Sequence, residues 1–181
     1  RTPLTLCIGE NLQTVEPGES VNLTNYIDRV CWLHHGGKGY VILPLKKLQL
    51  MVKSGKEINV TDSSIAKGKP GFVIALSHGA QPGEALDNAY RYIQLPNVTA
   101  EEMPQRVEAL LKDILFTAQE ATAHAVYSKA DGIRQYAFFK PASIEAGGIK
   151  VTSDDVAQIM LREVGNEWVM TVSNPMPDGQ K

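Results

Sequence analysis

Cysteine is scarce in this sequence of 181 residues, in which only Cys7 and Cys31 occur. Two cysteines can form one disulfide or none, so a disulfide framework and a cysteine-rich metal site are excluded. An excess of charge is also missing, because 18 Lys and Arg stand against 20 Asp and Glu, a net charge of −2. We therefore expect neither nucleic acid nor an anionic membrane as a partner.

Long apolar runs and targeting signals are absent too. No stretch is long and apolar enough to cross a bilayer. The chain opens at Arg1 without an initiator methionine or a charged-then-apolar leader, which predicts a soluble segment that was processed or excised. The length suggests one domain or two small ones, with ample material for a hydrophobic core.

Short apolar or alternating segments separated by Gly, Pro and Asn predict a β-rich fold. Residues 48–53 alternate, and a turn at 54–56 would join them to 58–61 in a half-buried hairpin. Residues 72–76 are continuously apolar and too short for a helix, which predicts a strand covered on both faces. Residues 90–95 are predicted to form a strand that Pro96 and Asn97 end.

One helix is expected after these strands. Thr99 and Glu102 have the spacing of a capping box, and apolar residues recur at helical intervals from Val107 to Ile114. Pro104 fits poorly inside a helix, so the helix should start near Met103 or Pro104. We place a domain boundary around residues 100–115.

A second β-sheet unit is predicted beyond this boundary. Residues 123–127 and 133–139 read as a hairpin with Gly132 in its turn. Residues 156–164 fit a helix or a strand, and we choose a strand, followed by a turn at Gly165 and a strong strand at 168–172.

His34 and His35 are adjacent, and paired histidines invite a metal hypothesis. In a strand, however, neighbouring side chains point to opposite faces, and the His-x3-His spacing is absent. We therefore predict no metal site and no cofactor. One histidine should be a partly buried hydrogen-bonding residue, while the other should face solvent or a ligand.

The sequence Gly36-Gly37-Lys38-Gly39 looks like a phosphate loop only superficially, because the Gly-x4-Gly-Lys-Ser/Thr spacing is missing. A turn between two strands is the better interpretation. No Gly-x-Ser-x-Gly elbow surrounds any serine, and the acidic pairs at 101–102 and 154–155 are typical of helix starts and turns. We assign no catalytic residue.

Aromatic side chains on one β-face could hold a sugar, because a flat ring covers the apolar face of a pyranose while polar groups bind its hydroxyls. The candidates are Trp32, Tyr40, Tyr90 and Tyr92. Their ordinary alternative is a place in the core between two sheets. Because residues 30–33 are apolar throughout, we predict that Trp32 is a packing anchor.

Several motifs, taken in order, resemble polysaccharide lyase family 8, the chondroitin and hyaluronan lyases. They are Trp32-x-His34-His35, Gly39-Tyr40, His78-Gly79, Tyr90-x-Tyr92, Leu95-Pro96-Asn97, Ala123-His124-Ala125-Val126, Tyr136-Ala137-Phe138-Phe139 and Val172-Ser173-Asn174-Pro175. The resemblance therefore covers nearly the whole chain. The resemblance rests on the order and spacing of these motifs rather than on any one of them.

The resemblance implies an all-β fold. Residues 1–100 would be the end of a central antiparallel β-sandwich (a supersandwich remnant), 101–118 a linker with a short helix, and 119–181 a smaller C-terminal β-sandwich. Family members cleave uronic-acid polysaccharides by β-elimination, with Tyr and His as acid and base groups. Because none of the Tyr, His or Arg residues here lies in the family's catalytic motif, no catalytic residue is carried over.

The chain alone is thus predicted to be an inactive, noncatalytic part of a secreted or periplasmic lyase. Its partners would be the upstream catalytic domains of the same parent and an anionic polysaccharide. His35 and Lys38 are the candidate substrate-binding residues, because glycines let the backbone approach a ligand and a lysine can pair with a carboxylate or sulfate. An autonomous carbohydrate-binding β-sandwich and a purely structural β-domain are the alternatives.

Overall fold

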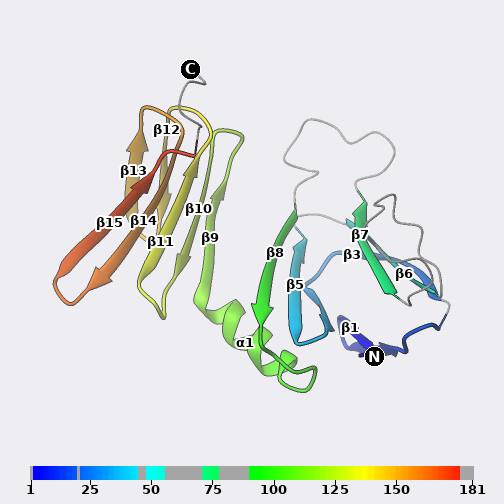
Figure 1. Ribbon diagram of the computed structural model, residues 1–181. Coiled ribbons are helices and arrows are strands. Elements are labelled where there is room, and N and C mark those ends of the chain that lie inside the picture. Colours follow the sequence, from blue (N-terminus) through cyan, green and yellow to red (C-terminus); the bar gives the residue numbers. More distant parts are fainter. Residues whose placement is uncertain (1, 20, 45–47, 56–70, 78–89, 176–181) are drawn as a thin grey trace. The chain divides into compact units, whose positions relative to one another are not determined.

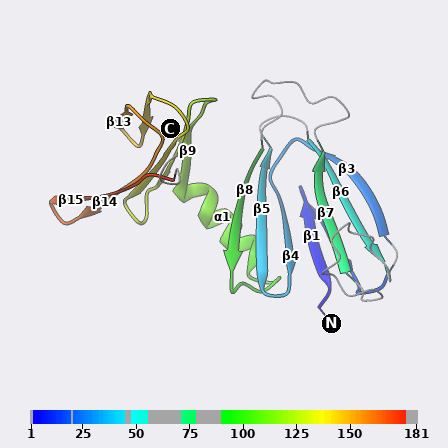
Figure 2. The ribbon, with the colours of Figure 1, turned by 45° about the horizontal axis from the view of Figure 1, so that its top comes forward.

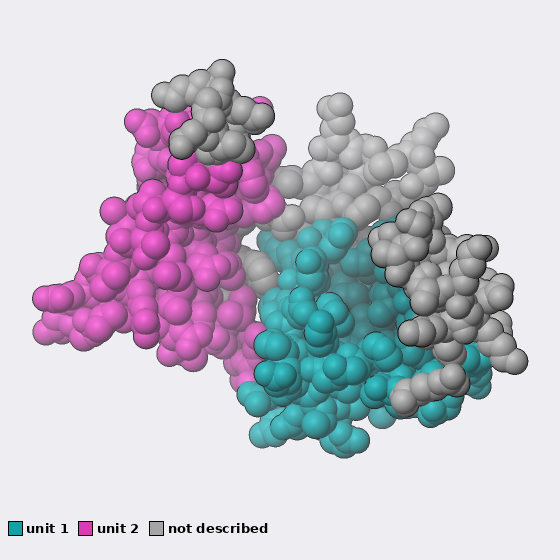
Figure 3. Space-filling view, in the orientation of Figure 1, with its two compact units in different colours: residues 1–107 teal, residues 108–181 magenta. Residues whose placement is uncertain are grey.

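The computed structural model describes residues 2–19, 21–44, 48–55, 71–77 and 90–175 (Figure 1). Its strands pair in an antiparallel manner throughout, and the described part of the chain contains one helix. The contacts divide the chain into unit 1, residues 1–107, and unit 2, residues 108–181 (Figure 3). The all-β class predicted from the sequence is confirmed. The finer domain limits at 1–100, 101–118 and 119–181 stay a prediction.

Unit 1 is a sandwich of two sheets that face each other (Figure 2). The five-stranded sheet has the order β2-β1-β4-β5-β8, and the three-stranded sheet has the order β3-β6-β7. Their bounds are β1 Leu4–Ile8, β2 Asn11–Val15, β3 Val21–Ile27, β4 Cys31–His35, β5 Lys38–Pro44, β6 Leu48–Gly55, β7 Gly71–Ser77 and β8 Tyr90–Pro96.

The core of unit 1 follows from the two-residue period of its strands. Alternate residues of β1 and β4, among them Leu4, Leu6 and Leu33, turn inward and meet Leu50 and Val52 of β6. Burying each such side chain contributes about 1.5–3 kcal/mol to the free energy of unfolding. This shared core holds the two sheets together.

The outer face of the five-stranded sheet is also apolar. Trp32 pairs with Val41 across β4 and β5, and both are buried, Trp32 at 6% exposure. The prediction that Trp32 is a packing anchor is confirmed. Next to them, a Cβ atom added to Gly39 would overlap the Sδ atom of Met103, so a residue without a side chain lets the start of the helix approach this sheet.

The helix α1 spans Met103–Asp113, which confirms the predicted start. Its capping box is formed as expected, because the backbone N–H of Thr99 donates to Glu102 Oε2 at 2.8 Å and the backbone N–H of Glu102 donates to Thr99 Oγ1 at 3.3 Å. No helix in the described ranges is long and apolar enough to cross a membrane.

Unit 2 pairs a five-stranded sheet, ordered β15-β14-β11-β10-β9, with the two-stranded sheet β12-β13. The bounds are β9 Ile114–Gln119, β10 Ala123–Ser128, β11 Ile133–Phe138, β12 Ala142–Ala146, β13 Ile149–Ser153, β14 Ala157–Val164 and β15 Glu167–Ser173. The predicted hairpin with Gly132 in its turn and the strand chosen for 156–164 are both confirmed.

A buried arginine ties the two sheets of unit 2 together. Arg134 donates from Nε to the carbonyl oxygen of Ala146 at 3.1 Å and from Nη2 to that of Gly147 at 2.9 Å. Its guanidinium carbon lies 4.1 Å from the ring centre of Tyr127 and 4.9 Å from that of Trp168. The side chain therefore fixes the β12–β13 turn on the larger sheet, beside the core of Tyr136, Phe138 and Ile144.

Two expectations about unit 1 require correction or fall outside the structure. Strand β7 exists, but its faces are not both covered: none of the residues 72–77 is buried, and Ile74 is 37% exposed. The reason is its place at the edge of the three-stranded sheet. The hairpin partner expected at 58–61 lies outside the described residues; within them, β6 pairs with β3 and β7.

Candidate functional site

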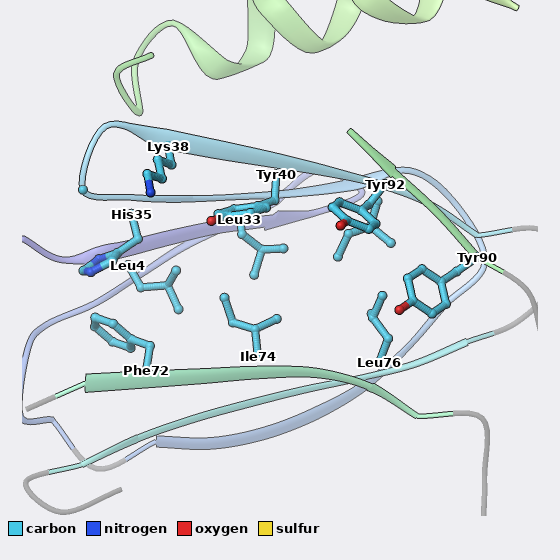
Figure 4. Close-up of a pocket in the computed structure, with 12 residues that line it drawn as sticks. Leu4, Leu33, His35, Lys38, Tyr40, Phe72, Ile74, Leu76, Tyr90 and Tyr92 are labelled. Atoms are coloured by element: carbon cyan, nitrogen blue, oxygen red, sulfur yellow. The ribbon is translucent and has the colours of Figure 1, made fainter. Parts of the chain in front are cut away.

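An open cavity of about 740 Å³ lies in unit 1 between β7 on one side and β1, β4, β5 and β8 on the other (Figure 4). We call it the inter-sheet cleft. Its lining consists of Leu4, Leu33, His35, Gly36, Lys38, Tyr40, Ile42, Phe72, Ile74, Leu76, Tyr90 and Tyr92. The cleft exists because the edge strand β7 leaves part of the larger sheet uncovered.

His35 and Lys38 lie together at one end of the cleft, at the β4–β5 turn. Gly36 and Gly37 have positive φ angles of 58° and 76° and form this turn, which glycine adopts without strain. His35 Nδ1 lies 3.3 Å from the carbonyl oxygen of Pro3, and its ring meets Phe72 edge-on at 5.0 Å between centres. Lys38 begins β5 and is exposed at the same end (Figure 4).

The other end of the cleft carries two tyrosines of β8. Tyr90 and Tyr92 are 37% and 58% exposed, and their ring centres lie 6.3 Å apart at an interplanar angle of 34°. Both side chains point from β8 toward β7 (Figure 4). The pattern predicted for β8 is present, because Tyr90, Tyr92 and Gln94 are exposed while the intervening residues are half-buried.

The electrostatic character of the cleft is one-sided. Lys38 and His35 are among its lining residues, whereas no Asp or Glu appears among the described residues that line it. The remaining lining is apolar or aromatic, with tyrosine hydroxyls as further hydrogen-bonding groups. This combination suits a ligand that has apolar faces, hydroxyl groups and a negative charge.

The two adjacent histidines diverge, as the two-residue period of a strand requires. His34 lies on the outer face, is 7% exposed, and its Nε2 atom is 2.8 Å from the carbonyl oxygen of Val98. His35 is exposed at the cleft. The expected division into one buried, hydrogen-bonded histidine (His34) and one exposed histidine (His35) is confirmed. Within the described ranges, no three His, Cys, Asp or Glu side chains are grouped so that they could hold a metal ion.

Comparison with known families adds a match in unit 2. Residues 117–181 match the family described as polysaccharide lyase family 8, C-terminal beta-sandwich domain. The strands β10–β15 of unit 2 lie within this range. The match covers about a third of the chain, and it supports a family 8 C-terminal domain for these residues. No curated protein matches the chain significantly.

Two solved lyase structures are similar to the chain as a whole. A chondroitinase AC lyase, studied in complex with oligosaccharides, shares 21% sequence identity at a TM-score of 0.67, over 97% of this chain and 25% of its own. A Paenibacillus xanthan lyase shares 18% identity at a TM-score of 0.59, over 94% of this chain and 17% of its own. At these identities the likeness establishes the fold. The chain spans about a quarter or less of the length of either protein.

Several residues of unit 1 lie at the cleft although sequence reasoning did not select them. Phe72, Ile74 and Leu76 form its β7 side. Their apolar run indicated a strand, but no local signal indicates that this strand is at a sheet edge. By contrast, the turn glycines singled out His35 and Lys38, which the structure brings together with Tyr40, Tyr90 and Tyr92. Trp32 lies on the opposite face of the sheet.

Proposed function

We propose that the chain is the noncatalytic β portion of a polysaccharide lyase whose parent cleaves uronic-acid polysaccharides of the chondroitin or hyaluronan type by β-elimination. The observation that carries this proposal is the likeness over 97% of this chain to a chondroitinase AC lyase, of which the chain spans 25%. The match of unit 2 to the family 8 C-terminal domain supports it independently.

The character of the inter-sheet cleft supports binding rather than proton transfer. Acid and base catalysis relies on groups held in fixed positions, and electrostatic stabilisation is strongest where water is excluded. Here His35 and Lys38 are exposed, and the cleft is open. We assign to His35 and Lys38 the contact with a carboxylate or sulfate of the polysaccharide. The parent would act outside the cytoplasm, secreted or periplasmic, where such polymers are found.

Activity is tested by incubating the chain with chondroitin and hyaluronan and following the ultraviolet absorbance of the unsaturated uronate product. We expect no rate above that of a buffer control. Turnover that disappears in the variants Tyr40→Phe or His35→Ala would contradict the noncatalytic assignment, because such a loss would place the acid or base in this chain.

Binding is tested by titrating the same chain with hyaluronan oligosaccharides. The variant Lys38→Ala should bind them more weakly and melt at an unchanged temperature, because the side chain is exposed. The matched control is Lys150→Ala, an exposed strand lysine of unit 2, which should bind as the unchanged chain does. Equal affinities of the Lys38→Ala and Lys150→Ala variants would refute the role of Lys38.

An autonomous carbohydrate-binding module is the second candidate. The exposure of Tyr90 and Tyr92 favours it, because exposed aromatic rings are the common platform for sugars. Tight binding by the chain in the absence of the rest of the parent would support this candidate. A purely structural domain predicts no binding at all.

A further inference from the structure

We propose that the inter-sheet cleft binds an extended anionic oligosaccharide, with its acidic group at the His35–Lys38 end and a later sugar ring stacked on Tyr92 at the other end. The inference rests on the carbohydrate binding proposed above and deepens it. It assigns a specificity role to a tyrosine at the end of the cleft remote from the charge.

The distance between the two ends follows from strand register. Lys38 pairs with Pro96 across β5 and β8, whereas Ile42 pairs with Tyr92 and Pro44 pairs with Tyr90. At about 3.3 Å per residue, the four residues from Lys38 to Ile42 span roughly 13 Å and the six to Pro44 roughly 20 Å. Figure 4 shows Lys38 and Tyr90 at opposite ends of the cleft. A single pyranose cannot contact both ends.

The middle of the cleft suits a chain of sugar rings. Ile74 of β7 lines it on one side and is 37% exposed, whereas Leu33 and Ile42 on the other side are almost fully buried and form its floor. The exposed apolar surface of Ile74 fits the C–H face of a pyranose ring, while the hydroxyl of Tyr40 can bind a sugar hydroxyl. The described part of the lining contains no carboxylate that would repel a uronate.

Tyr92 is the residue whose contact with the ligand depends on the length of the ligand. Its ring is 58% exposed and stands next to that of Tyr90. An aromatic contact of this kind is worth about 0.5–1.5 kcal/mol, which corresponds to a roughly two- to tenfold change in affinity. That gain is available only to a ligand long enough to reach from Lys38 to Tyr92.

The experiment is a calorimetric titration of the full chain with hyaluronan di-, tetra- and hexasaccharides. For the unchanged chain, we expect affinity to rise with length. The variant Tyr92→Ala should bind the disaccharide normally and lose roughly two- to tenfold in affinity for the hexasaccharide. Tyr92→Phe should bind the hexasaccharide almost as tightly as the unchanged chain does, because the aromatic ring remains. Lys38→Ala should weaken binding of every length by a similar factor.

Controls separate the contribution of Tyr92 from a general loss of apolar surface. Leu12→Ala removes an apolar side chain of β2 that is 63% exposed and should leave all affinities unchanged. A neutral β-glucan hexasaccharide should bind more weakly than the hyaluronan hexasaccharide. Thermal melts of each variant establish that the fold is retained.

The outcomes distinguish this inference from the proposed function. Disaccharide binding that depends on Lys38 but does not strengthen with length would overturn the extended-ligand inference alone. An equal loss at every length in Tyr92→Ala would do the same. If no oligosaccharide of any length binds, the sugar-binding role is wrong as well, and the cleft is then a surface that another part of the parent covers.

Discussion

Replacing Arg134 by Met should strongly destabilise unit 2. The side chain is 6% exposed, donates to the carbonyl oxygens of Ala146 and Gly147, and lies against the rings of Tyr127 and Trp168. A methionine of similar length fills part of the same space. It cannot donate the two hydrogen bonds that hold the β12–β13 turn, so the variant tests these contacts rather than the volume of the side chain.

The magnitude can be worked out from these contacts. A hydrogen bond from a charged donor contributes about 1.5–3 kcal/mol, and a cation–π contact adds about 0.5–2 kcal/mol. One term opposes them, because Arg134 Nη1 is buried and has no hydrogen-bond partner among the described residues, and a buried polar group of this kind costs about 1–3 kcal/mol. The net loss in the free energy of unfolding should therefore be about 3 kcal/mol.

The assay is urea unfolding followed by NMR signals of unit 2, so that unit 1 does not obscure the transition. Arg162→Met is the matched control, because Arg162 is an exposed arginine on the neighbouring strand β14, and surface substitutions usually change stability by less than about 0.5 kcal/mol. Arg134→Lys should lose most of the same free energy, since a lysine cannot make both hydrogen bonds. Equal urea midpoints for Arg134→Met and Arg162→Met would refute the reasoning.

Three further perturbations test unit 1. Trp32→Ala should lower the free energy of unfolding by about 3–5 kcal/mol, because a buried aromatic is lost; a melting temperature equal to that of the unchanged chain would contradict this. Gly39→Ala should destabilise by overlap with Met103, and its cost should be smaller in a Met103→Ala background than in the unchanged chain; an equal cost in both backgrounds would mean that the strain lies elsewhere. Burial, with a smaller effect of Cys7, raises the pKa of Cys31 from 9.0 to about 12. Cys31 therefore contributes stability that is fully present below pH 9 and is lost as the pH rises toward 12. In Cys31→Val, the free energy of unfolding, measured by urea unfolding, should decline less over this pH range. A decline equal to that of the unchanged chain would argue against a buried thiol.

The features that sequence predicted well are those determined by neighbours in the chain. The start of α1 was predictable because the capping partners Thr99 and Glu102 are three residues apart. The hairpin around Gly132 was predictable because its turn has a positive φ of 63°, which favours glycine. The alternation of β8 between exposed and half-buried residues followed from the period of a strand.

The features that sequence did not predict depend on which strands become neighbours. The apolar run 72–76 indicated burial on both faces, yet the strand lies at a sheet edge and faces the cleft. Arg134 was not selected, because a lone arginine in a strand carries no sign of the turn it will meet 12 and 13 residues later. His35 and Lys38 were selected, and three tyrosines were named as candidates, but their meeting in one cleft depends on the pairing of β5 with β8.

The register of β4 explains why adjacent histidines perform different roles in this region. His34 pairs with Gly39 and turns toward the segment before α1, where it meets the carbonyl oxygen of Val98. His35 pairs with Lys38 and turns toward the cleft. Because side chains alternate between the faces of a sheet, a slip of one residue would exchange the two histidines and would move Trp32 from the packed outer face toward the cleft. The packing of Trp32 and Gly39 on the outer face therefore also places His35 and Lys38 together at the cleft.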